Sequence, residues 1–458
     1  MAMQQRAGGE DRVSALPDAT LTRILSHLDT HQAVRSSALS RRWRHVFTTV
    51  PVVHLSARPR PPGCRKAPVR IEHMVNSVLL NHDCTAPIRS FRVICLGSPP
   101  SDILIDQWIA TALFAGAEKL DLDLPPRVTE QPIWPHTGTS VDEAPDVLTE
   151  LSCSMPRYLF RSNAADATLR HLRLASCKLD LPEQALFLGS LETLWLRRVN
   201  APGEALQRLV AACPRLAELT LEECPTVKRI SVALLHLRTF KIRCCHNATR
   251  VFVDAPSLQS LGFKGSVAGC SALSLPDWGE VALAVDICMP FLERCTNLTS
   301  VSLSAQQQPP FFLWHRARLP GLTHLELRGP FRNRGHIAAL ANILDDTTGL
   351  EVLTLAIDRP QVNEASTCRV IKVPKDVRPS NAECFRRTLR KIQLVKYSGT
   401  TTQRRLALFL LTKAVRAEEL HVTFATGVGG GSETDQFKKE MEGWKRNPKT
   451  RIIYHAHG

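Results

Sequence analysis

The residues best able to do chemistry in this sequence are its fourteen cysteines and sixteen histidines. No two cysteines have the C-x-x-C spacing of a zinc knuckle or a thioredoxin-like site, and Cys244 and Cys245 are adjacent. His27 and His31 are four residues apart, but a helix break is expected between them and the glutamate of H-E-x-x-H is absent. We therefore expect no metal site and no cofactor, with most cysteines acting as small buried hydrophobic residues.

Two other patterns could indicate nucleotide or covalent chemistry. The glycine-rich stretch 427–431 lacks the Lys-Ser/Thr pair with which a phosphate loop reaches a nucleotide, so a flexible turn is expected. No cysteine lies in a recognisable nucleophile motif, and no carboxylate pair or Ser/His/Asp set is marked by its local sequence. The sequence therefore predicts no catalytic residue and no enzyme, and its function is expected to rest on binding.

Composition and charge limit the class of partner. The 458 residues are 44% hydrophobic and 22% charged, which allows a folded core. The net charge of +15 could indicate nucleic acid, but the positive charge is spread over short clusters and only three tyrosines are present to stack on bases. Residues 1–11 lack the apolar core of a secretory signal, and no apolar run reaches the roughly 18 residues of a membrane span. We expect neither nucleic acid nor a membrane as partner, and a location in the cytoplasm and/or nucleus.

Three short helical patterns occupy the first fifty residues. The first is expected to open at Pro17 and Asp18, the second to span about 31–37 and the third to follow Ser40. Three short helices bury little apolar area, so this module is expected to need a partner or the neighbouring domain for stability. The expected apolar faces are formed in turn by Leu21, Ile24, Leu25 and Leu28, by Ala33 and Val34, and by Trp43, Val46 and Phe47.

Four segments of this module have the order and spacing of a plant F-box. They are LPD at 16–18, ILSHL at 24–28, AVR at 33–35 and LSRRWR at 39–44. The resemblance implies docking to the Skp-type adaptor of a cullin-RING (SCF) ubiquitin ligase, and through the adaptor to the cullin. Apolar anchors with an aromatic also suit a helix-in-groove contact. The expected adaptor-binding residues are Leu16, Pro17, Leu21, Ile24, Leu25, Leu28, Val34, Leu39 and Trp43.

The same apolar residues could instead form the core of the module, and both roles can hold together. Ala19 and Thr20 stand where members of the family commonly carry acidic or apolar residues, which would weaken the contact slightly. After the F-box, expected over 11–52, the Pro- and Arg-rich passage 58–63 cannot lie inside a helix or a central strand. We therefore expect residues 53–84 to be a linker between two modules.

A leucine motif recurs beyond this passage. The sequence from Leu169 to Leu179 fits the LxxLxLxxCxL pattern of a leucine-rich repeat without a mismatch, and seven further repeats begin at residues 191, 216, 237, 258, 298, 322 and 350. The 40-residue advance from 258 to 298 predicts a hidden repeat near 273–283, and weaker matches start at 88 and 117. Residues 125–145 are expected to form an exposed loop. The repeats are expected to occupy 85–365.

Outward positions of the repeat strands are expected to form a face that binds a target. Alternate residues of a strand point to opposite sides, so the residue between the two inward leucines faces out. Trp195 would be a strong anchor there, although packing beside a loop explains it as well. The expected target-binding residues are Arg173, Trp195, Lys241 and Glu326.

The segment 383–422 combines a strand pattern, a turn at Gly399, a long apolar helix and a further strand. It resembles the FBD module that follows leucine-rich repeats in plant F-box proteins, and a cap is what an open repeat stack requires. We expect this cap over 381–425 and a tail over 426–458 with a short charged helix and a closing strand.

Together these patterns predict an α/β protein: a short three-helix F-box, a leucine-rich-repeat solenoid of parallel strands with irregular helical or loop returns, and an FBD-like C-terminal cap. The expected function is that of a substrate-recognition subunit of an SCF ligase, which binds the adaptor at one end and an unknown protein target on the repeats. The alternative is a scaffold that keeps the adaptor contact without promoting degradation.

Overall fold

The chain folds into two compact units, which a computed structural model describes over most of its length. The first unit comprises Met1–Leu194 and Val199–Ala205, and the second comprises Trp195–Arg198 and Leu206–Gly458. The described residues are 13, 15–56, 70–95, 100–124, 153–161, 168–183, 186–201, 204–245, 247–248, 250–264, 297–304, 319–329, 334–357, 382–425 and 431–455.

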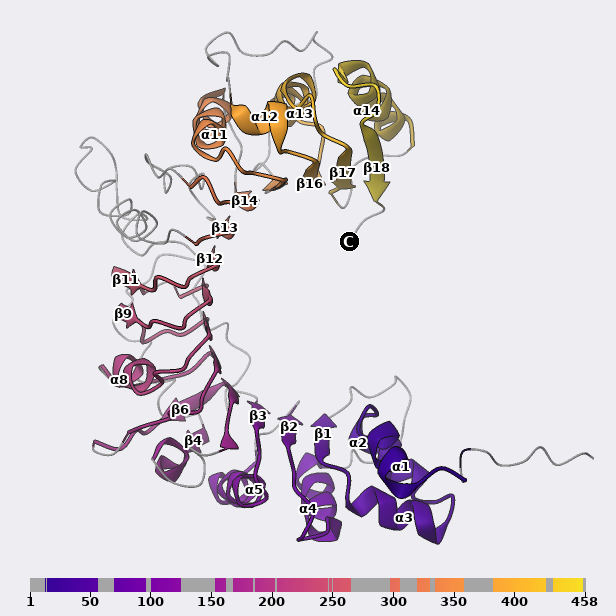
Figure 1. Ribbon diagram of the computed structural model, residues 1–458, viewed down its shortest axis with the longest axis vertical. Helices are drawn as coiled ribbons and strands as arrows, with labels where there is room; N and C mark the ends of the chain where they lie inside the picture. Colours follow the sequence, from indigo (N-terminus) through magenta and orange to yellow (C-terminus); the bar gives the residue numbers. More distant parts are fainter. Residues whose placement is uncertain are drawn as a thin grey trace, which may run out of the picture. The chain divides into compact units, whose positions relative to one another are not determined.

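Three short helices open the first unit (Figure 1): α1 (Asp18–Leu25), α2 (Thr30–Ser36) and α3 (Arg41–Thr48). Local side chains determine where two of them begin. The Asp29 carboxylate accepts a hydrogen bond from Gln32 N at 2.8 Å, and Ser40 Oγ accepts one from Trp43 N at 3.2 Å. Each contact satisfies a backbone donor that would otherwise lack a partner at a helix start.

The rest of the first unit consists of parallel strands alternating with helices. Strands β1, β2, β3 and β5 lie side by side in that order, and β4 pairs with β6 in a small separate sheet. The elements are β1 (Val52–Ser56), α4 (Ile71–Asn81), β2 (Ser90–Ile94), α5 (Asp102–Phe114), β3 (Lys119–Asp123), β4 (Cys153–Met155), η1 (Arg157–Phe160), β5 (His171–Ala175) and β6 (Cys177–Leu179).

The expected linker over 53–84 is wrong for most of the residues that the structure describes there. Strand β1 pairs with β2 along its whole length, from Val52↔Ser90 to Ser56↔Ile94, and helix α4 buries Val75 and Val78. The Pro- and Arg-rich passage 58–63 lies outside the described residues. The residues VVHLS alternate in burial, as a strand with one buried face does. The F-box helices are therefore followed directly by a first repeat, formed by β1 and α4.

The second unit continues the same construction. Its main strands are parallel and follow one another in chain order, while β9 and β11 pair separately. Strand β7 (Thr193–Arg197) falls at the division between the units. The other elements are α8 (Ala205–Ala211), β8 (Glu218–Glu222), β9 (Arg229–Ala233), β10 (Thr239–Arg243), β11 (Arg250–Asp254), β12 (Ser260–Lys264), β13 (Ser300–Ser304), β14 (His324–Gly329), α11 (Arg334–Asp346), β15 (Val352–Ile357), α12 (Glu383–Arg387), β16 (Lys391–Tyr397), α13 (Thr401–Lys413), β17 (Glu419–Phe424), α14 (Gly431–Trp444) and β18 (Arg451–His455).

The leucine pattern of the eight repeats is confirmed by burial and register. The residues at positions one, four and six of these repeats are buried, apart from the half-buried Phe263. Equivalent positions face each other across neighbouring strands, as in Leu219↔Phe240 and Phe240↔Leu261. Stacking therefore buries a continuous row of apolar side chains that no single repeat could bury alone.

The hidden repeat expected near 273–283 does not insert a strand into this sheet. Strand β12 pairs directly with β13, from Ser260↔Ser300 to Ser304 opposite Lys264. Residues 265–296 and the expected loop 125–145 lie outside the described residues. The long advance between these repeats is therefore an insertion between adjacent strands, and counting residues alone could not distinguish it from a degenerate repeat.

The repeats that begin at residues 169, 191, 216 and 237 share an unusual backbone conformation at position eight. The non-glycine residues with positive φ in the described part are Ser176, Arg198, Glu223, Cys244 and Lys396, with φ from 51° to 61°. The cysteine that follows at position nine lies beneath the turn, as the sequence predicted: Cys224 is 1% exposed, and its thiol donates to Leu196 O at 3.5 Å.

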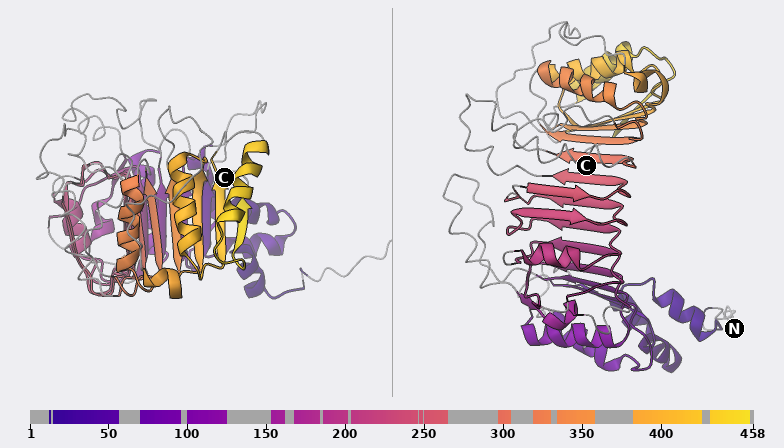
Figure 2. Two further views of the ribbon diagram at one scale, coloured as in Figure 1. Left: turned by 90° about the horizontal axis from the view of Figure 1, so that it is seen from above. Right: turned by 60° about the vertical axis from the view of Figure 1, so that its left-hand side comes forward.

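The C-terminal strands carry helices on one side (Figures 1 and 2). Helix α13 is the expected long apolar helix, and α14 and β18 are the expected tail helix and closing strand. Because β18 pairs with β17 in the same sheet, the tail is part of the cap rather than a separate segment. A buried ion pair joins the two helices, with Arg404 Nε donating to Glu440 at 2.9 Å.

Candidate functional site

Three of the expected adaptor-binding residues form the core of the F-box helices. Leu21 is 0% exposed, Leu25 is 1% exposed and Trp43 is 7% exposed. They pack with Ala33 and Val46 in one cluster. Their side chains therefore hold the three helices together, and any effect they have on a partner comes through the fold.

A second group of the expected residues lies on the surface of the same helices. Ile24 is 41% exposed, Leu28 and Val34 are each 37% exposed, and Leu39 is 70% exposed. Pro17 is also exposed, while Leu16 is partly buried against the core. This group gives the F-box a set of apolar side chains that its own fold leaves in water.

The prediction of one apolar stripe over four residues is wrong for Ile24 and Leu28. Helix α1 ends at Leu25, and the chain turns at Ser26, so Leu28 no longer follows the helix axis. Ile24 lies about 100° around the helix from Leu25, which turns it away from the core. The early end of the helix therefore accounts for the exposure of Leu28, and the angle around the helix accounts for that of Ile24.

A single arginine fixes the Leu-Pro turn against the third helix. Arg42 Nε donates to Asp18 Oδ1 at 2.7 Å, and another nitrogen of the same guanidinium donates to Leu16 O. Pro17 precedes α1 at its N-cap position with φ −59° and ψ 150°. Arg42 therefore holds the residues on both sides of Pro17, and the opposite charges of Arg42 and Asp18 are the one signal for this contact in the sequence.

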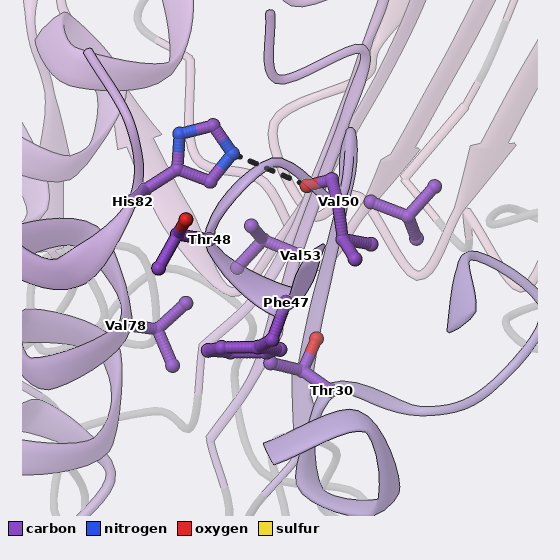
Figure 3. A pocket seen from close by; sticks show the side chains of 8 residues that line it. Thr30, Phe47, Thr48, Val50, Val53, Val78 and His82 are labelled. Atoms are coloured by element: carbon purple, nitrogen blue, oxygen red, sulfur yellow. Dashed lines mark hydrogen bonds between the residues drawn. The ribbon is translucent and has the colours of Figure 1, made fainter. Parts of the chain in front are cut away.

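The F-box helices are joined to the first repeat through a close-packed contact (Figure 3). His54 N, on β1, donates to Thr30 Oγ1 at 2.6 Å, and Asp83 N donates to Thr48 O at 2.9 Å. His82 Nε2 donates to Val50 O at 3.2 Å, as the dashed line in Figure 3 marks. Two of these bonds reach the end of α4, which the sequence placed in a linker.

This contact, which we call the F-box joint, leaves only a small hollow. About 10 Å³ of free space lies among Thr30, Phe47, Val53, Val78 and His82, roughly enough for one water molecule. The joint is therefore a packed interior within the first unit. The module that was expected to need a neighbour for stability has one in its own first repeat.

The protonation of His54, which lies at the joint, is affected by positive side chains on the neighbouring strands β2 and β3. The pKa of His54 is lowered below 6.5 because the ring is buried, and Arg92 and Lys119 add to the effect. Its Nε2 lies 2.8 Å from Ser90 Oγ on β2. His54 is therefore expected to be neutral at pH 7, as a residue within a packed contact should be.

The four expected target-binding residues occupy outward strand positions, as predicted. In the first unit, Arg173 lies 3.7 Å from Asp121, which also pairs with Arg92 at 3.0 Å. In the second unit, the Arg197 guanidinium lies over the Trp195 ring at 5.4 Å. Trp195 is half-buried, so it presents only part of its ring to a partner.

Lys241 and Glu326 lie in one register row of the second unit, separated by small residues. The row runs Lys241, Gly262, Ser302, Glu326 across adjacent strands, and it continues to Thr354. The Lys241 stem crosses close to Gly262, and Ser302 Oγ donates to Glu326 at 3.0 Å. The outward face of these repeats is therefore largely polar, and Ser302 and Glu326 satisfy each other within it.

Most of the described cysteines are buried. The nine described cysteines are free, and burial raises the pKa of the Cys95 and Cys384 thiols to about 12. A thiol with a raised pKa is a poor nucleophile and a poor metal ligand. Among the described residues no group of three His, Cys, Asp or Glu side chains could hold a metal ion, and no described helix is long and apolar enough to cross a membrane.

Two protein-family models match this chain. A model described as At1g61320/AtMIF1, LRR domain, matches residues 79–445. A model of the F-box domain matches residues 13–55. The first match begins near the end of α4 and runs through α14, and the second covers α1, α2, α3 and nearly all of β1.

Relatives of known name come from Arabidopsis thaliana. The F-box/FBD/LRR-repeat protein At5g56420 is 26% identical over 431 residues, which cover 89% of this chain and 90% of the relative. The F-box/LRR-repeat protein At3g03360 is 25% identical over 383 residues, 75% of this chain and 70% of the relative. The putative F-box/LRR-repeat protein At3g58880 is 31% identical over 270 residues, 55% and 52% of the two chains. The FBD in the first name agrees with the resemblance found in the C-terminal segment.

Proposed function

Because this chain belongs to the F-box/leucine-rich-repeat family, we propose that it acts as the substrate-recognition subunit of an SCF ubiquitin ligase. In this proposal the F-box helices bind a Skp-type adaptor, which connects the protein to a cullin. The outward face of the repeats binds a target protein. Other subunits transfer ubiquitin, and this chain raises the local concentration of the target beside them.

The observation that carries the proposal is the exposed apolar group on the F-box helices. Ile24, Leu28, Val34 and Leu39 keep between 37% and 70% of their surface in water although a core lies directly beneath them. Burying apolar surface is the main favourable contribution to most protein associations. Helix surfaces with such anchors suit a partner that offers an apolar groove.

The F-box joint fixes the position of the F-box helices against the first repeat within the first unit. Backbone and side-chain hydrogen bonds connect α2, α3 and α4 with β1, and apolar side chains fill the space between them. An adaptor bound to the F-box is therefore held in a defined position relative to the first repeats. A fixed geometry favours transfer reactions because the reacting groups need not search for each other.

Affinity purification tests the proposal. The full-length protein and a Leu16→Ala/Pro17→Ala variant are each purified with bound partners, and a Leu235→Ala variant serves as control because Leu235 is 70% exposed in the second unit. We expect adaptor and cullin to be recovered with wild type and control and to be lost from the double variant. Equal recovery of the adaptor from all three would contradict this docking site.

A second measurement separates ligase function from the alternative of a scaffold. The partners that remain bound to the double variant are the candidate targets. If the protein directs degradation, the lifetime of those partners lengthens when the protein is depleted. Unchanged lifetimes with an intact adaptor contact would favour the scaffold.

A further inference from the structure

Strand β18 is the last strand of the main sheet in the described part of the chain, and its outer edge is open. It pairs in parallel with β17 over all five of its residues, Arg451–His455. No described strand lies on its other side. Figure 1 shows it at the end of the row formed by β16, β17 and β18. An open edge offers a row of backbone N–H and C=O groups to another strand.

The backbone of β18 shows which of these groups face outward. Arg451 N donates to Glu418 O at 2.8 Å, so the amide of Arg451 faces β17. Successive residues of a paired strand turn their backbone groups to opposite sides. The N–H and C=O groups of Ile452 and Tyr454 therefore face away from β17. They are the groups to which an added strand would bond.

The apolar side chains of β18 are less buried than those of the strand beside it. Leu420 and Val422, at the matching positions of β17, are fully buried. Ile452 and Tyr454 are only half-buried, as is Ile453 on the opposite side of the strand. Strand β17 has a neighbour on each side, whereas β18 has one. A further strand with apolar residues in the row of Ile452 and Tyr454 would complete their burial.

The chain that leads into this edge carries positive charge. Residues 443–455 contain two lysines and two arginines and no acidic residue. Three of these four basic side chains are exposed, namely those of Arg446, Lys449 and Arg451. Arg451 lies 3.9 Å from the Glu419 carboxylate, so part of its charge is balanced within the sheet. A strand added beside β18 would still lie against a cationic border.

We propose that the open edge of β18 binds an extended segment of a partner protein in which acidic residues alternate with apolar ones. The segment joins the sheet as one more strand. Because side chains alternate across a strand, its apolar residues continue the row of Ile452 and Tyr454, and its acidic residues lie on the opposite side with Arg451. This contact is on the edge of the sheet, whereas the proposed function uses the F-box helices and the outward face of the repeats.

A second copy of this chain fits the edge less well. If two β18 strands paired in parallel and in register, the two Arg451 side chains would lie opposite each other, and like charges directly opposite destabilise a sheet. In an antiparallel pair centred on Ile453, each Arg451 would lie opposite a His455. Neither pairing supplies the carboxylates that a cationic border attracts.

Peptide binding to the full-length protein tests this inference. The probe is a fluorescein-labelled peptide of about six residues, the length of a typical strand, in which Glu alternates with Val. A peptide with Lys in place of Glu is the control for charge. Two further versions of the probe are N-methylated, one at every Glu and the other at every Val. Fluorescence anisotropy measures the affinity of each peptide.

We expect the Glu peptide to bind at least about tenfold more tightly than the Lys peptide. N-methylation should abolish binding in one version and spare it in the other, because an added strand turns only alternate N–H groups toward β18. A peptide held by charge alone would tolerate both methylations equally. Equal binding of the two methylated versions, equal binding of the Glu and Lys peptides, or no saturable binding of the probe would each overturn the inference.

Two variants of the protein locate the contact. Ile452→Pro removes an N–H group that faces the open edge, where proline costs no bond to β17. Lys449→Gln/Arg451→Gln removes positive charge beside the edge. Its matched control, Arg229→Gln/Arg238→Gln, changes two exposed arginines elsewhere in the second unit. We expect each test variant to bind the Glu peptide about tenfold more weakly than wild type and the control to bind as wild type does.

Other outcomes reject the inference in distinct ways. Unchanged affinity in both test variants would place peptide binding elsewhere on the protein. Sedimentation velocity examines the second copy, because wild-type dimers that dissociate in Ile452→Pro would show that β18 pairs with itself. If thermal denaturation shows that Ile452→Pro is unstable, the methylated peptides and wild type decide the question. The experiment uses no adaptor, so its failure leaves the proposed function standing.

Discussion

The F-box helices and the leucine-rich repeats differ in how many of their apolar pattern residues they leave exposed to water. The repeats bury the apolar residues at their pattern positions and turn polar residues outward, where those residues bond to one another, as Ser302 does with Glu326 and Thr354 with Gln393 at 3.2 Å. The F-box buries only part of its apolar pattern and leaves Leu39 70% exposed.

This difference indicates two kinds of recognition. A surface of exposed apolar groups gains free energy from any partner that covers it, so it suits a constant partner. A surface of polar groups that are already bonded gains only when a partner supplies equivalent bonds, so it suits selective recognition. Under the proposed function, the F-box would make the general contact and the repeats the discriminating one.

The largest effect is expected from shortening a buried F-box residue. Leu25→Ala should destabilise the F-box helices by about 3 kcal/mol, because it removes buried methyl groups and leaves a cavity. Leu39→Ala should change stability by less than about 0.5 kcal/mol, since that side chain is exposed. Denaturant unfolding of both variants measures the change in the free energy of unfolding. Equal losses of stability in the two variants would contradict the assignment of Leu25 to the core and Leu39 to the surface.

A smaller effect is expected in the cap, where Phe437 packs closely against Gly399. Gly399 has φ +71°, and a methyl group there would overlap the Phe437 ring of α14. Gly399→Ala should therefore cost about 2 kcal/mol and loosen α14 from the sheet. Hydrogen exchange of α14 reports the loosening. Gly443→Ala is the control, since nothing lies within 4 Å of a methyl group there, and similar exchange in both variants would argue against this close contact.

A gain in stability is expected at the register irregularity near the end of strand β16. Lys396 holds φ at 61°, a conformation that costs a non-glycine residue about 1 kcal/mol. Lys396→Gly should stabilise the protein by up to about 1 kcal/mol, whereas Lys391→Gly, on the extended part of β16, should destabilise it. Thermal denaturation distinguishes the two, and a loss of stability at both positions would mean that the turn carries no strain.

The smallest effect is expected from pH at the F-box joint. Burial lowers the pKa of His54 in the folded protein below the value of 6.5 that it has in the unfolded chain. Between the lowered pKa and pH 6.5, the unfolded chain therefore binds a proton that the folded chain does not. Stability is therefore complete above pH 6.5 and is lost as pH falls through the lowered pKa. Denaturant midpoints of wild type and His54→Gln at pH 7.5 and 5.5 measure this. The variant should lose less on acidification, and equal losses would exclude His54 as the cause.

The eight repeats that begin between residues 169 and 350 could be predicted from sequence, because a regular leucine spacing leaves one way to bury the pattern. The F-box motifs were also recognisable, but the direction of each side chain was not. Leu28 fits a helical stripe only if α1 continues past Leu25, and the end of a short helix depends on tertiary contacts. The same holds for β1, whose five residues were hidden beside a Pro-rich passage.

The joint was missed for a related reason. Thr30, His54 and His82 are far apart in sequence, and none belongs to a motif. Their contact exists only once β1 is paired with β2 and α4 is folded against it. Alternation of apolar residues in VVHLS was the one available signal, and it indicated a strand but not its neighbours.

The most direct test of the account is a calorimetric titration of the full-length protein with purified Skp-type adaptor. Wild type is compared with Ile24→Ser/Leu39→Ser and with Leu80→Ser/Phe114→Ser, whose residues are 85% and 91% exposed on α4 and α5. We expect the first variant to bind about 100-fold more weakly with unchanged thermal stability, and the second to bind as wild type does. Equal affinity of all three proteins would contradict the claim that the exposed apolar residues of the F-box helices form the docking surface.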